Sequence, residues 1–371
     1  MSTSNRGGTG AALQERPLLS VIVPAYNEDN IIQRSLSAIC EYLVTLETEF
    51  RWELIVVDDG STDATGQIAE SFASKRDNVL VLHHKFNFKL GQALRFAFNR
   101  SRGDYVVVLD ADLSYSPDHI GRMLGRMEQT GAKIVIASPY TKGGKVSNVP
   151  WLRRLLSLWA NRFLAMTVAK DSQSDKLTTI TGMVRAYDGD FLRRISLKSM
   201  DVEINPEIIY KAKILRARIT ECPAHLDWKP ECESRSPVKQ RKSSLKIARS
   251  LVHHVLSGYI FRPFMFFIVP GAVIFALSLY PLTWTVINTI RDYRRITNPA
   301  LTFGYRLSDA VGAAFRISPH AFIVGGIALL VAIQLISLGL LSLQKKRYFE
   351  ELFYLNTTIH KDLRQNPASK P

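Results

Sequence analysis

The sequence has 371 residues, of which 46% are hydrophobic, and its formal net charge is +15. Its mean hydropathy of +0.00 is high for a protein that is soluble throughout, so we expect part of the chain to lie in a membrane. Three cysteines without a C-x-x-C pair argue against a disulfide framework and against a zinc site. The basic residues gather beside hydrophobic segments and no nucleic-acid-binding motif occurs, so we expect no nucleic-acid partner.

The first part of the chain indicates an α/β domain. Residues 1–10 are small, polar and rich in glycine, and we expect a disordered tail at 1–17 that is neither a signal peptide nor an anchor. Short apolar runs then alternate with helix-like stretches, which is typical of a mostly parallel, Rossmann-like sheet. The strand-like runs are 18–24, 52–58, 78–83, 104–110 and 133–138. Because ligands bind at the carboxyl ends of parallel strands, the residues after these runs are the first candidates for a site.

Two of these strand ends carry polar side chains. The first run ends in Pro24-Ala25-Tyr26-Asn27-Glu28 and the second in Asp58-Asp59-Gly60-Ser61-Thr62-Asp63. Carboxylates there can accept hydrogen bonds from a base and a ribose, and Tyr26 offers a flat face for stacking. For Ser61 and Asp63 we expect only a role at the start of the next helix. The adjacent acids Asp58 and Asp59 are more than a cap requires.

The fourth run ends in Asp110-Ala111-Asp112. Two carboxylates at this spacing can converge on one hard divalent cation, while phosphate oxygens and water complete its shell. We therefore expect Mg²⁺ or Mn²⁺ at this strand end, where it would neutralise a departing diphosphate.

The region at 139–235 is less regular. We expect a basic amphipathic helix at 151–170, a strand at the T-T-I-T-G segment 178–182 and a helix from about Asn205. In the first of these helices three polar residues recur every four positions and share one face: Arg153, Ser157 and Asn161. This face can hold an anionic monophosphate; the alternative is a solvated face on a packed helix.

The C-terminal part contains two apolar segments, 263–290 and 319–344, each long enough to cross a bilayer. We expect a two-helix transmembrane hairpin with a connecting loop at 291–318. A basic, amphipathic juxtamembrane helix at 236–262 precedes it, and a cytoplasmic tail at 345–371 follows it. Basic clusters outside both segments favour a cytoplasmic position for the N-terminal domain, although the connecting loop also contains arginines. The alternative is a buried helical hairpin in a soluble core.

The order VIVPAYNE, VVDDGSTD and VLDADL resembles the catalytic domain of family 2 glycosyltransferases, which have the GT-A fold. The resemblance covers residues 18–235, with a donor half at 18–138 and an acceptor half at 139–235. With the hairpin, the chain is similar to the dolichol-phosphate mannose synthases and the bacterial polyprenyl-phosphate glycosyltransferases. This implies transfer of one hexose from GDP-mannose or UDP-glucose to a dolichyl or undecaprenyl phosphate, with inversion. It also implies a multi-pass protein of a bacterial or archaeal inner membrane rather than of the endoplasmic reticulum.

The resemblance assigns roles to individual residues. Asp110 and Asp112 would hold the metal, with Ser114 where relatives carry a glutamine ligand, and these two aspartates and Arg153 would be the catalytic residues. The nucleotide sugar would contact Pro24, Ala25, Tyr26, Glu28, Asp58, Asp59, Asp110 and Ala111, and we expect Lys89 of this chain to add a phosphate contact. The lipid phosphate would contact Lys142, Arg153, Ser157, Asn161, Arg185, Arg241 and Ser243. Lys89 replaces a glycine of the family motif, and Lys142 is expected to supply the charge of an arginine. Glu203 and Glu207 lie where some relatives place a functional acid.

Two other functions fit parts of this pattern. A processive polysaccharide synthase shares the DDG and DAD elements, but the Q-x-x-R-W motif of such enzymes does not occur. A catalytically silent nucleotide-sugar sensor or scaffold in the membrane would not need the intact Asp110 and Asp112. The sequence leaves a homo-oligomer open.

Overall fold

The computed structural model describes residues 16–151, 154–155, 157–158, 161–162, 177–228, 265–296 and 302–365. The chain divides into two compact units. One consists of residues 1–257 together with 353–371, and the other of residues 258–352. The predicted catalytic domain lies in the first unit, and the predicted spans lie mainly in the second.

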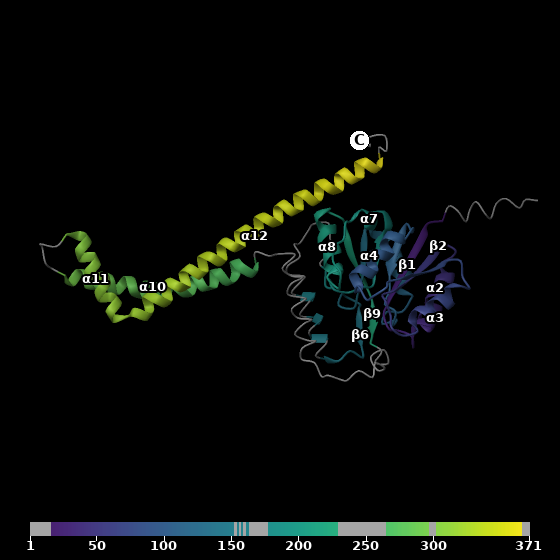
Figure 1. Ribbon diagram of the computed structural model, residues 1–371, viewed down its shortest axis with the longest axis horizontal. Helices are drawn as coiled ribbons and strands as arrows, with labels where there is room; N and C mark the ends of the chain where they lie inside the picture. Colours follow the sequence, from purple (N-terminus) through teal and green to yellow (C-terminus); the bar gives the residue numbers. More distant parts are fainter. Residues whose placement is uncertain are drawn as a thin grey trace, which may run out of the picture. The chain divides into compact units, whose positions relative to one another are not determined.

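The first unit is built on a seven-stranded sheet (Figure 1). Its strands are β1 (Leu18–Ala25), β2 (Arg51–Asp58), β3 (Val79–His83), β4 (Tyr105–Val108), β5 (Ile134–Ser138), β7 (Arg185–Asp188) and β8 (Ile219–Pro223). Their order is β3-β2-β1-β4-β7-β5-β8, and only β7 runs antiparallel to its neighbours. The predicted fold class, a mostly parallel sheet of the GT-A type, is confirmed, and so are the five predicted strands.

The prediction of a strand at 178–182 is wrong. The backbone N–H groups of Thr178 and Thr179 both donate to the Glu221 carboxylate, at 2.7 Å each. The next two backbone N–H groups donate to Asn161 Oδ1, at 2.8 and 3.2 Å. Side chains thus take the donors that a strand would share with a neighbouring strand, and β7 begins only afterwards.

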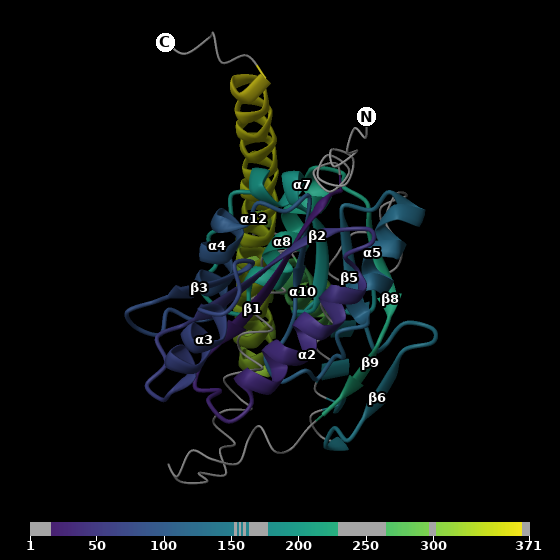
Figure 2. The same cartoon turned by 90° about the vertical axis from the view of Figure 1, so that its right-hand side faces the viewer.

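Helices flank the sheet, and a short two-stranded ribbon lies beside it (Figure 2). The helices are α2 (Ile32–Thr45), α3 (Thr65–Ala73), α4 (Leu90–Arg100), α5 (His119–Thr130), α7 (Gly189–Arg194) and α8 (Ile204–Ile214). The ribbon pairs β6 (Lys145–Ser147) with β9 (His225–Asp227). Helix α8 confirms the helix predicted from about Asn205.

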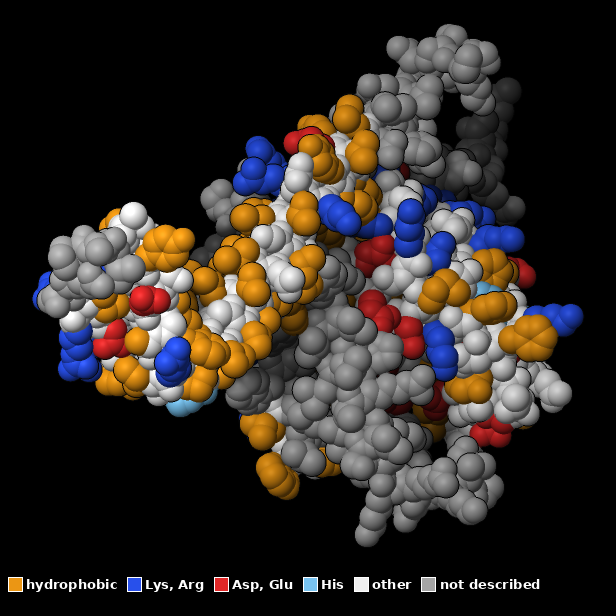
Figure 3. All heavy atoms as spheres, turned by 60° about the vertical axis from the view of Figure 1, so that its left-hand side comes forward, with side chains coloured by type: hydrophobic (Ala, Val, Ile, Leu, Met, Phe, Trp, Pro, Cys, Tyr) orange, Lys and Arg blue, Asp and Glu red, His pale blue; other side chains and the backbone are white. Residues whose placement is uncertain are grey.

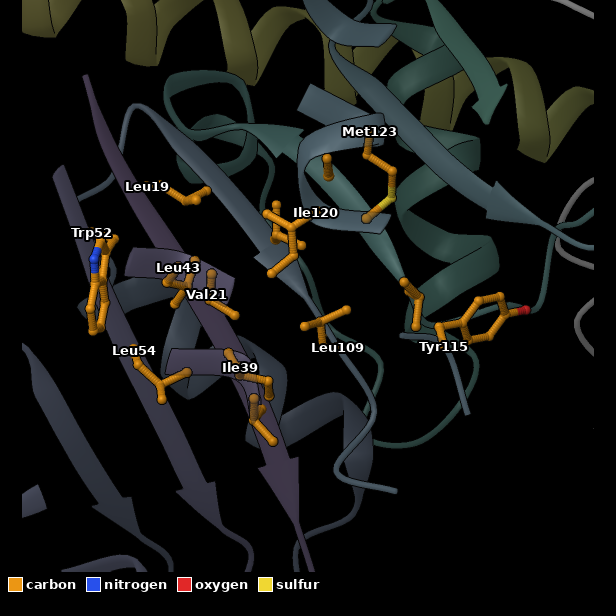
Figure 4. Close-up of a cluster of buried hydrophobic side chains, with 14 of the residues drawn as sticks. Leu19, Val21, Ile39, Leu43, Trp52, Leu54, Leu109, Tyr115, Ile120 and Met123 are labelled. Atoms are coloured by element: carbon orange, nitrogen blue, oxygen red, sulfur yellow. The ribbon is translucent and has the colours of Figure 1, made fainter. Parts of the chain in front are cut away.

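The core of the first unit fills the space between the sheet and its helices. Apolar residues of α2 spaced three and four apart, among them Ile39 and Leu43, are fully buried. They lie beside side chains of β1 and β2, such as Leu19 and Leu54 (Figure 4). Burying each of these side chains contributes about 1.5–3 kcal/mol to folding. This core fixes the central strands and therefore the loops that follow them.

The centre of the sheet brings three predicted strand ends together. β1 pairs in parallel with β2 on one side and with β4 on the other. Ala25 lies opposite Asp58, and the segment with Asp110 follows β4 directly. The acidic and polar residues from three distant parts of the sequence therefore meet at one edge.

The second unit contains α10 (Met265–Arg295), α11 (Phe303–Ile317) and most of α12 (Pro319–Gln365). α10 and α12 are long and apolar enough to cross a bilayer, as predicted from length and composition. Only 11% and 17% of their most apolar windows are buried, so the alternative of a hairpin inside a soluble core is not favoured. Hydrophobic side chains cover much of their described surface in Figure 3.

The helices extend beyond the predicted segments. α10 continues to Arg295, and α12 continues through most of the predicted tail. The connecting loop predicted at 291–318 contains the 15-residue helix α11, which was missed. Its apolar residues follow a helical period, but with arginines and glycines among them they resemble an irregular linker.

Candidate functional site

The centre of the candidate site is the segment that follows β4. Ser114 orients Asp112, because its backbone N–H donates to Asp112 Oδ1 at 2.8 Å and its hydroxyl donates to Oδ2 at 2.6 Å. Ser114 is buried. The predicted role of Ser114 as a metal ligand stays a prediction; in the structure its hydroxyl is bonded to Asp112. Ala111 is also buried, so its side chain belongs to the core rather than to a binding surface.

Glu28, at the end of β1, completes a group of three interacting acids. Burial, followed by the charges of Asp112 and Asp63, raises the pKa of Glu28 to about 7. Burial, followed by the charges of Asp112 and Glu28, raises the pKa of Asp110 to about 7. These carboxylates therefore repel one another when ionised, and a divalent cation would relieve that repulsion.

The donor set fits a hard divalent cation only in combination with other ligands. Within the described ranges, no three His, Cys, Asp or Glu side chains come close enough to enclose a metal ion. Asp110 and Asp112 would supply two oxygen ligands, and substrate oxygens and water would have to supply the others. Such an open site is what the D-x-D spacing predicts. Glu28, expected at the nucleoside, adds negative charge to the same place.

The Asp58 and Asp59 carboxylates are used within the protein. Asp58 is buried, and it accepts from Ser61 N and from His83 Nδ1, at 3.0 Å each. Asp59 is buried as well. Its carboxylate accepts from His84 Nδ1 at 2.7 Å and from the backbone N–H groups of the residues at 88 and 89, at 3.0 and 2.9 Å. Asp59 therefore holds the segment between β3 and α4 against the end of β2.

The sequence analysis missed the two histidines that face these acids. His84 stacks on Phe96, with 5.1 Å between ring centroids. His83 also lies 2.8 Å from Glu70. Burial by itself would lower the pKa of His83, but the hydrogen bonds that the imidazole donates to Asp58 and Glu70 outweigh burial and raise this pKa. The sequence did offer a signal for them, because two adjacent histidines lie at the end of the strand-like run at 78–83, next in the chain after the run that ends in Asp58 and Asp59.

Lys89 has an unusual backbone. Its φ of 76° and ψ of 163° lie in a region that only glycine adopts without strain. The N–H of Lys89 donates to Asp59, and α4 begins at the next residue. The backbone conformation at position 89 is therefore one that suits the glycine of the family motif, and in this chain the residue at that position is a lysine. The Lys89 side chain is exposed at the edge of the site.

The turn after β1 is joined to the turn after β2. Asn27 N donates to Ser61 Oγ at 3.0 Å, and Glu28 N donates to Thr65 Oγ1 at 2.7 Å. Asp63 accepts from Thr65 at the start of α3. Asp63 thus has the expected role at the start of α3, whereas the Ser61 hydroxyl contacts the turn after β1 instead. Tyr26 remains 43% exposed and accessible for stacking, Pro24 is half-buried, and Ala25 is buried in the core.

The residues predicted to bind the lipid phosphate differ in their surroundings, and some lie outside the described residues. Arg153, Arg241 and Ser243 lie outside the described residues. Lys142 is exposed. Ser157 Oγ accepts from Tyr140 OH at 2.9 Å. Asn161 is buried, and its amide oxygen accepts from the backbone at 180–181, so the prediction that it contacts the acceptor is wrong.

The prediction for Arg185 is also wrong. Its side chain is fully buried, and its guanidinium donates to the carbonyl oxygens of Gly182 at 2.7 Å and Asn205 at 2.9 Å, and to that of Ile180. Burial lowers the pKa of Arg185. This arginine joins the 178–182 segment to α8 and cannot contact a lipid phosphate.

Glu207 is a structural acid. Its carboxylate accepts from the backbone N–H groups of Lys198 at 3.0 Å and Ser199 at 2.8 Å, and it pairs with Lys211. Burial raises the pKa of Glu207, but these hydrogen bonds outweigh burial and leave the pKa below its usual value. These contacts favour a structural role for Glu207 over that of the functional acid that some relatives place here.

Glu207→Gln is expected to lower the free energy of unfolding at pH 7 by about 3 kcal/mol, because it breaks a buried pair. A carboxylate whose pKa is lowered on folding stabilises the protein above its unfolded-state pKa, and this contribution disappears as the pH falls through the folded pKa. Urea unfolding from pH 7 down to about pH 3 should therefore show the two proteins converging in acid. A pH-independent difference would contradict this.

Comparison with known proteins places this geometry in a family. The model of "Glycosyl transferase family 2" matches residues 20–195, which contain the Glu28, Asp58-Asp59 and Asp110-Ala111-Asp112 segments. Residues 20–195 are thus similar to the family 2 glycosyltransferases. This domain contains the first five strands of the sheet and β7, and it ends shortly before α8.

Two curated proteins are similar to this chain in sequence. A dolichol-phosphate mannosyltransferase of Pyrococcus furiosus is 32% identical over 205 residues, which are 55% of this chain and 55% of that protein. A polyprenol monophosphomannose synthase of Mycolicibacterium smegmatis is 35% identical over 188 residues, which are 49% of this chain and 65% of that protein. The chain thus matches between about half and two thirds of the length of these relatives.

Among solved structures, glucosyl-3-phosphoglycerate synthase of Mycobacterium tuberculosis is similar, in a crystal structure with Mn²⁺, UDP-glucose and phosphoglyceric acid. The TM-score is 0.47 at 19% identity, with coverage of 70% of this chain and 85% of that one.

Proposed function

We propose that this protein transfers one mannose from a nucleotide diphosphate sugar to a polyprenyl phosphate at the membrane surface. The observation that carries the proposal is the convergence of Glu28, Asp110 and Asp112 at the carboxyl edge of a family 2 domain that is followed by two apolar helices. The names of the two mannosyltransferase relatives favour mannose, with GDP-mannose as donor; UDP-glucose is the alternative. The domain would face the cytoplasm of a bacterial or archaeal cell.

The proposed site binds the donor along the strand ends. Asp110 and Asp112 would hold Mg²⁺ or Mn²⁺, which neutralises the diphosphate when bound. Tyr26 would stack on the base. Asp59 would act mainly through the segment that it holds, because three hydrogen bonds already occupy its carboxylate. Lys89 would place a cation beside the donor phosphates.

The reaction needs little proton transfer. An acceptor phosphate oxygen, already ionised near neutral pH, forms the bond to the anomeric carbon while the bond from that carbon to the diphosphate oxygen breaks. The nucleoside diphosphate leaves with the bonding electrons, and a single displacement inverts the anomeric centre. Catalysis then rests on positioning two anions and on screening their repulsion with cations such as Lys142 and Arg153.

Replacement of Lys89 separates strain from function. Lys89→Gly is expected to raise the free energy of unfolding by about 1 kcal/mol, because glycine adopts this backbone without strain, and to weaken donor binding about tenfold through loss of the charge. Lys89→Ala loses the charge and keeps the strain, so only binding should suffer. Urea unfolding and calorimetric titration with the donor measure the two effects. Unchanged donor affinity in both variants would remove Lys89 from the site.

A donor screen on the purified full chain tests the proposed function. Labelled GDP-mannose and UDP-glucose are each offered with polyprenyl phosphate, with Mg²⁺, with Mn²⁺, and with a chelator. We expect labelled lipid from GDP-mannose only when a metal ion is present. Donor binding without lipid product would support the silent sensor instead, and a growing polymer would support a processive synthase.

Arg153→Ala is expected to raise the KM for polyprenyl phosphate at least about tenfold and to leave the KM for the donor unchanged, because the arginine would hold only the acceptor phosphate. Arg154→Ala is the matched control, since this exposed neighbour lies off the predicted face. Equal effects of the two variants on the KM for polyprenyl phosphate would refute the assignment of Arg153.

A further inference from the structure

The second unit contains a helical segment beyond its paired helices. α10 and α12 lie side by side: Gly271 lies against Ile336, and Gly325 lies against Leu282. The pairing reaches the start of α12, where Trp284 Nε1 donates to the Ser318 hydroxyl at 3.3 Å. α10 then continues for about three more turns, to Arg295. The residues 285–295 of α10 and 303–317 of α11 are here called the α10–α11 cap.

α11 is fixed to the end of α10 (Figure 1). Ala310 and Ala314, one turn apart on α11, are fully buried. One turn before them, Arg306 lies with its guanidinium 4.8 Å from the Tyr293 ring centroid and donates to the carbonyl oxygen of Ile296 at 2.8 Å. The cap is therefore a packed helix pair whose buried face carries an arginine.

Buried polar atoms without partners gather in this cap. On α10, Thr285, Asn288 and Asp292 follow one another at spacings of three and four residues and share a face. Asn288 and Asp292 are 2% and 7% exposed. Within the part of the chain that the structure describes, Thr285 Oγ1, Asn288 Nδ2, Asp292 Oδ2 and Arg306 Nε are buried and have no hydrogen-bond partner. Such groups are costly to bury unless a polar molecule satisfies them.

The charge of the cap indicates what that molecule is. The cap contains five arginines and two aspartates, so its net charge is +3. The arginines are Arg291, Arg294, Arg295, Arg306 and Arg316, and the aspartates are Asp292 and Asp309. Asp292 Oδ1 already faces Arg295, at 3.6 Å. The remaining unpartnered groups include two N–H donors and a hydroxyl, and arginine is the side chain best suited to phosphate.

One flank of the cap is apolar and exposed. Leu307, Val311 and Phe315 recur every four residues along α11 and are 40%, 40% and 43% exposed, and Ile290 of α10 is 48% exposed. The paired part of α10 before the cap is about 25–30 Å long, close to the thickness of the hydrocarbon core. The arginines of the cap then lie at headgroup depth, with the apolar flank next to the acyl chains.

We propose that the α10–α11 cap is an interfacial binding site for the phosphate groups of anionic phospholipids. Arg306, Asn288 and Thr285 would supply the buried donors, the other arginines the surrounding charge, and Leu307, Val311 and Phe315 the contact with acyl chains. Asp292, held by Arg295, would take part through water. This assigns a role to the arginines of the connecting segment, which the positive-inside tendency leaves without one. The proposal concerns the second unit and does not depend on the proposed transferase activity.

The test uses the full chain, delipidated in detergent, with phosphatidylglycerol or phosphatidylcholine of the same acyl composition added. Phosphatidylglycerol is expected to raise the unfolding temperature of the second unit's helices by about 5 °C, and phosphatidylcholine by much less. Arg316→Gln, an exposed position, should remove at least half of this shift, and Arg306→Gln should remove most of it. Arg34→Gln, at an exposed position on α2, is the matched control and should keep the full shift.

Three results would overturn the proposal. Equal shifts with the two lipids would mean that the net negative charge of the headgroup is not recognised, because phosphatidylcholine carries a phosphate as well but is neutral overall. A shift that survives in Arg316→Gln, in a protein whose unfolding without lipid matches wild type, would remove the arginines from the site, even where Arg306→Gln does not fold. Association into dimers without added lipid, abolished by Val311→Asp, would show that a second copy of the chain covers this face instead.

Discussion

Asp112→Asn is expected to reduce turnover by about three orders of magnitude, because a neutral amide loses the charge that holds the divalent cation and about 4 kcal/mol of transition-state stabilisation. The variant should fold as well as wild type. After burial, the charge of Asp112 is the next cause that raises the pKa of Glu28 and of Asp110, so its neutralisation removes repulsion from the folded state. Metal binding, measured by Mn²⁺ titration, should weaken together with turnover.

Asp77→Asn is the control for this variant, since Asp77 is exposed in the segment before β3. Full turnover in Asp112→Asn would contradict the metal assignment. A loss of turnover that comes with a lower unfolding temperature would also contradict it, because the acid would then be structural. Ser114→Ala, which removes the hydroxyl bonded to Asp112, should weaken Mn²⁺ binding by about 10-fold or more if orientation of the carboxylate matters.

Asp59→Asn is expected to destabilise the protein by about 3 kcal/mol even when no donor is present. The carboxylate is buried and accepts three hydrogen bonds, two of them from backbone N–H groups that cannot turn away. An asparagine would present an NH₂ group to one of these donors. Urea unfolding without ligand measures the loss of stability, and calorimetric titration measures the accompanying loss of donor affinity.

A direct contact between Asp59 and the nucleoside predicts a different result for Asp59→Asn. If Asp59 acted only by accepting a hydrogen bond from the nucleoside, the variant would lose donor affinity and keep its stability. Stability equal to that of Asp77→Asn, with weakened donor binding, would therefore restore the role that the sequence resemblance gave to Asp59. Loss of both quantities is the result expected from the structure.

The sequence determined the strands and the apolar helices of this protein, because both depend on local patterns. The strand-like runs that end before Asp58 and Asp110 are β-branched and apolar in a way that few helices are, and the five predicted strands are present. The acidic D-x-D segment and the long uncharged helices could likewise be recognised from consecutive residues. Local spacing also put Ser157 and Asn161 on one helical face.

Only the tertiary structure decided which way such faces point. Helical spacing puts Asn161 on a face of the helix, but it does not determine whether that face contacts solvent or the 178–182 segment. The charge of Arg185 likewise suggests an exposed side chain, because the carbonyl oxygens that accept its hydrogen bonds come from other segments. Glu28 joins Asp110 and Asp112 across more than eighty residues of sequence because β1 lies beside β4. The helix α11 was hidden because it becomes an element only by packing on α10. In each case the deciding energy comes from burial and hydrogen bonding between segments that are far apart in the chain.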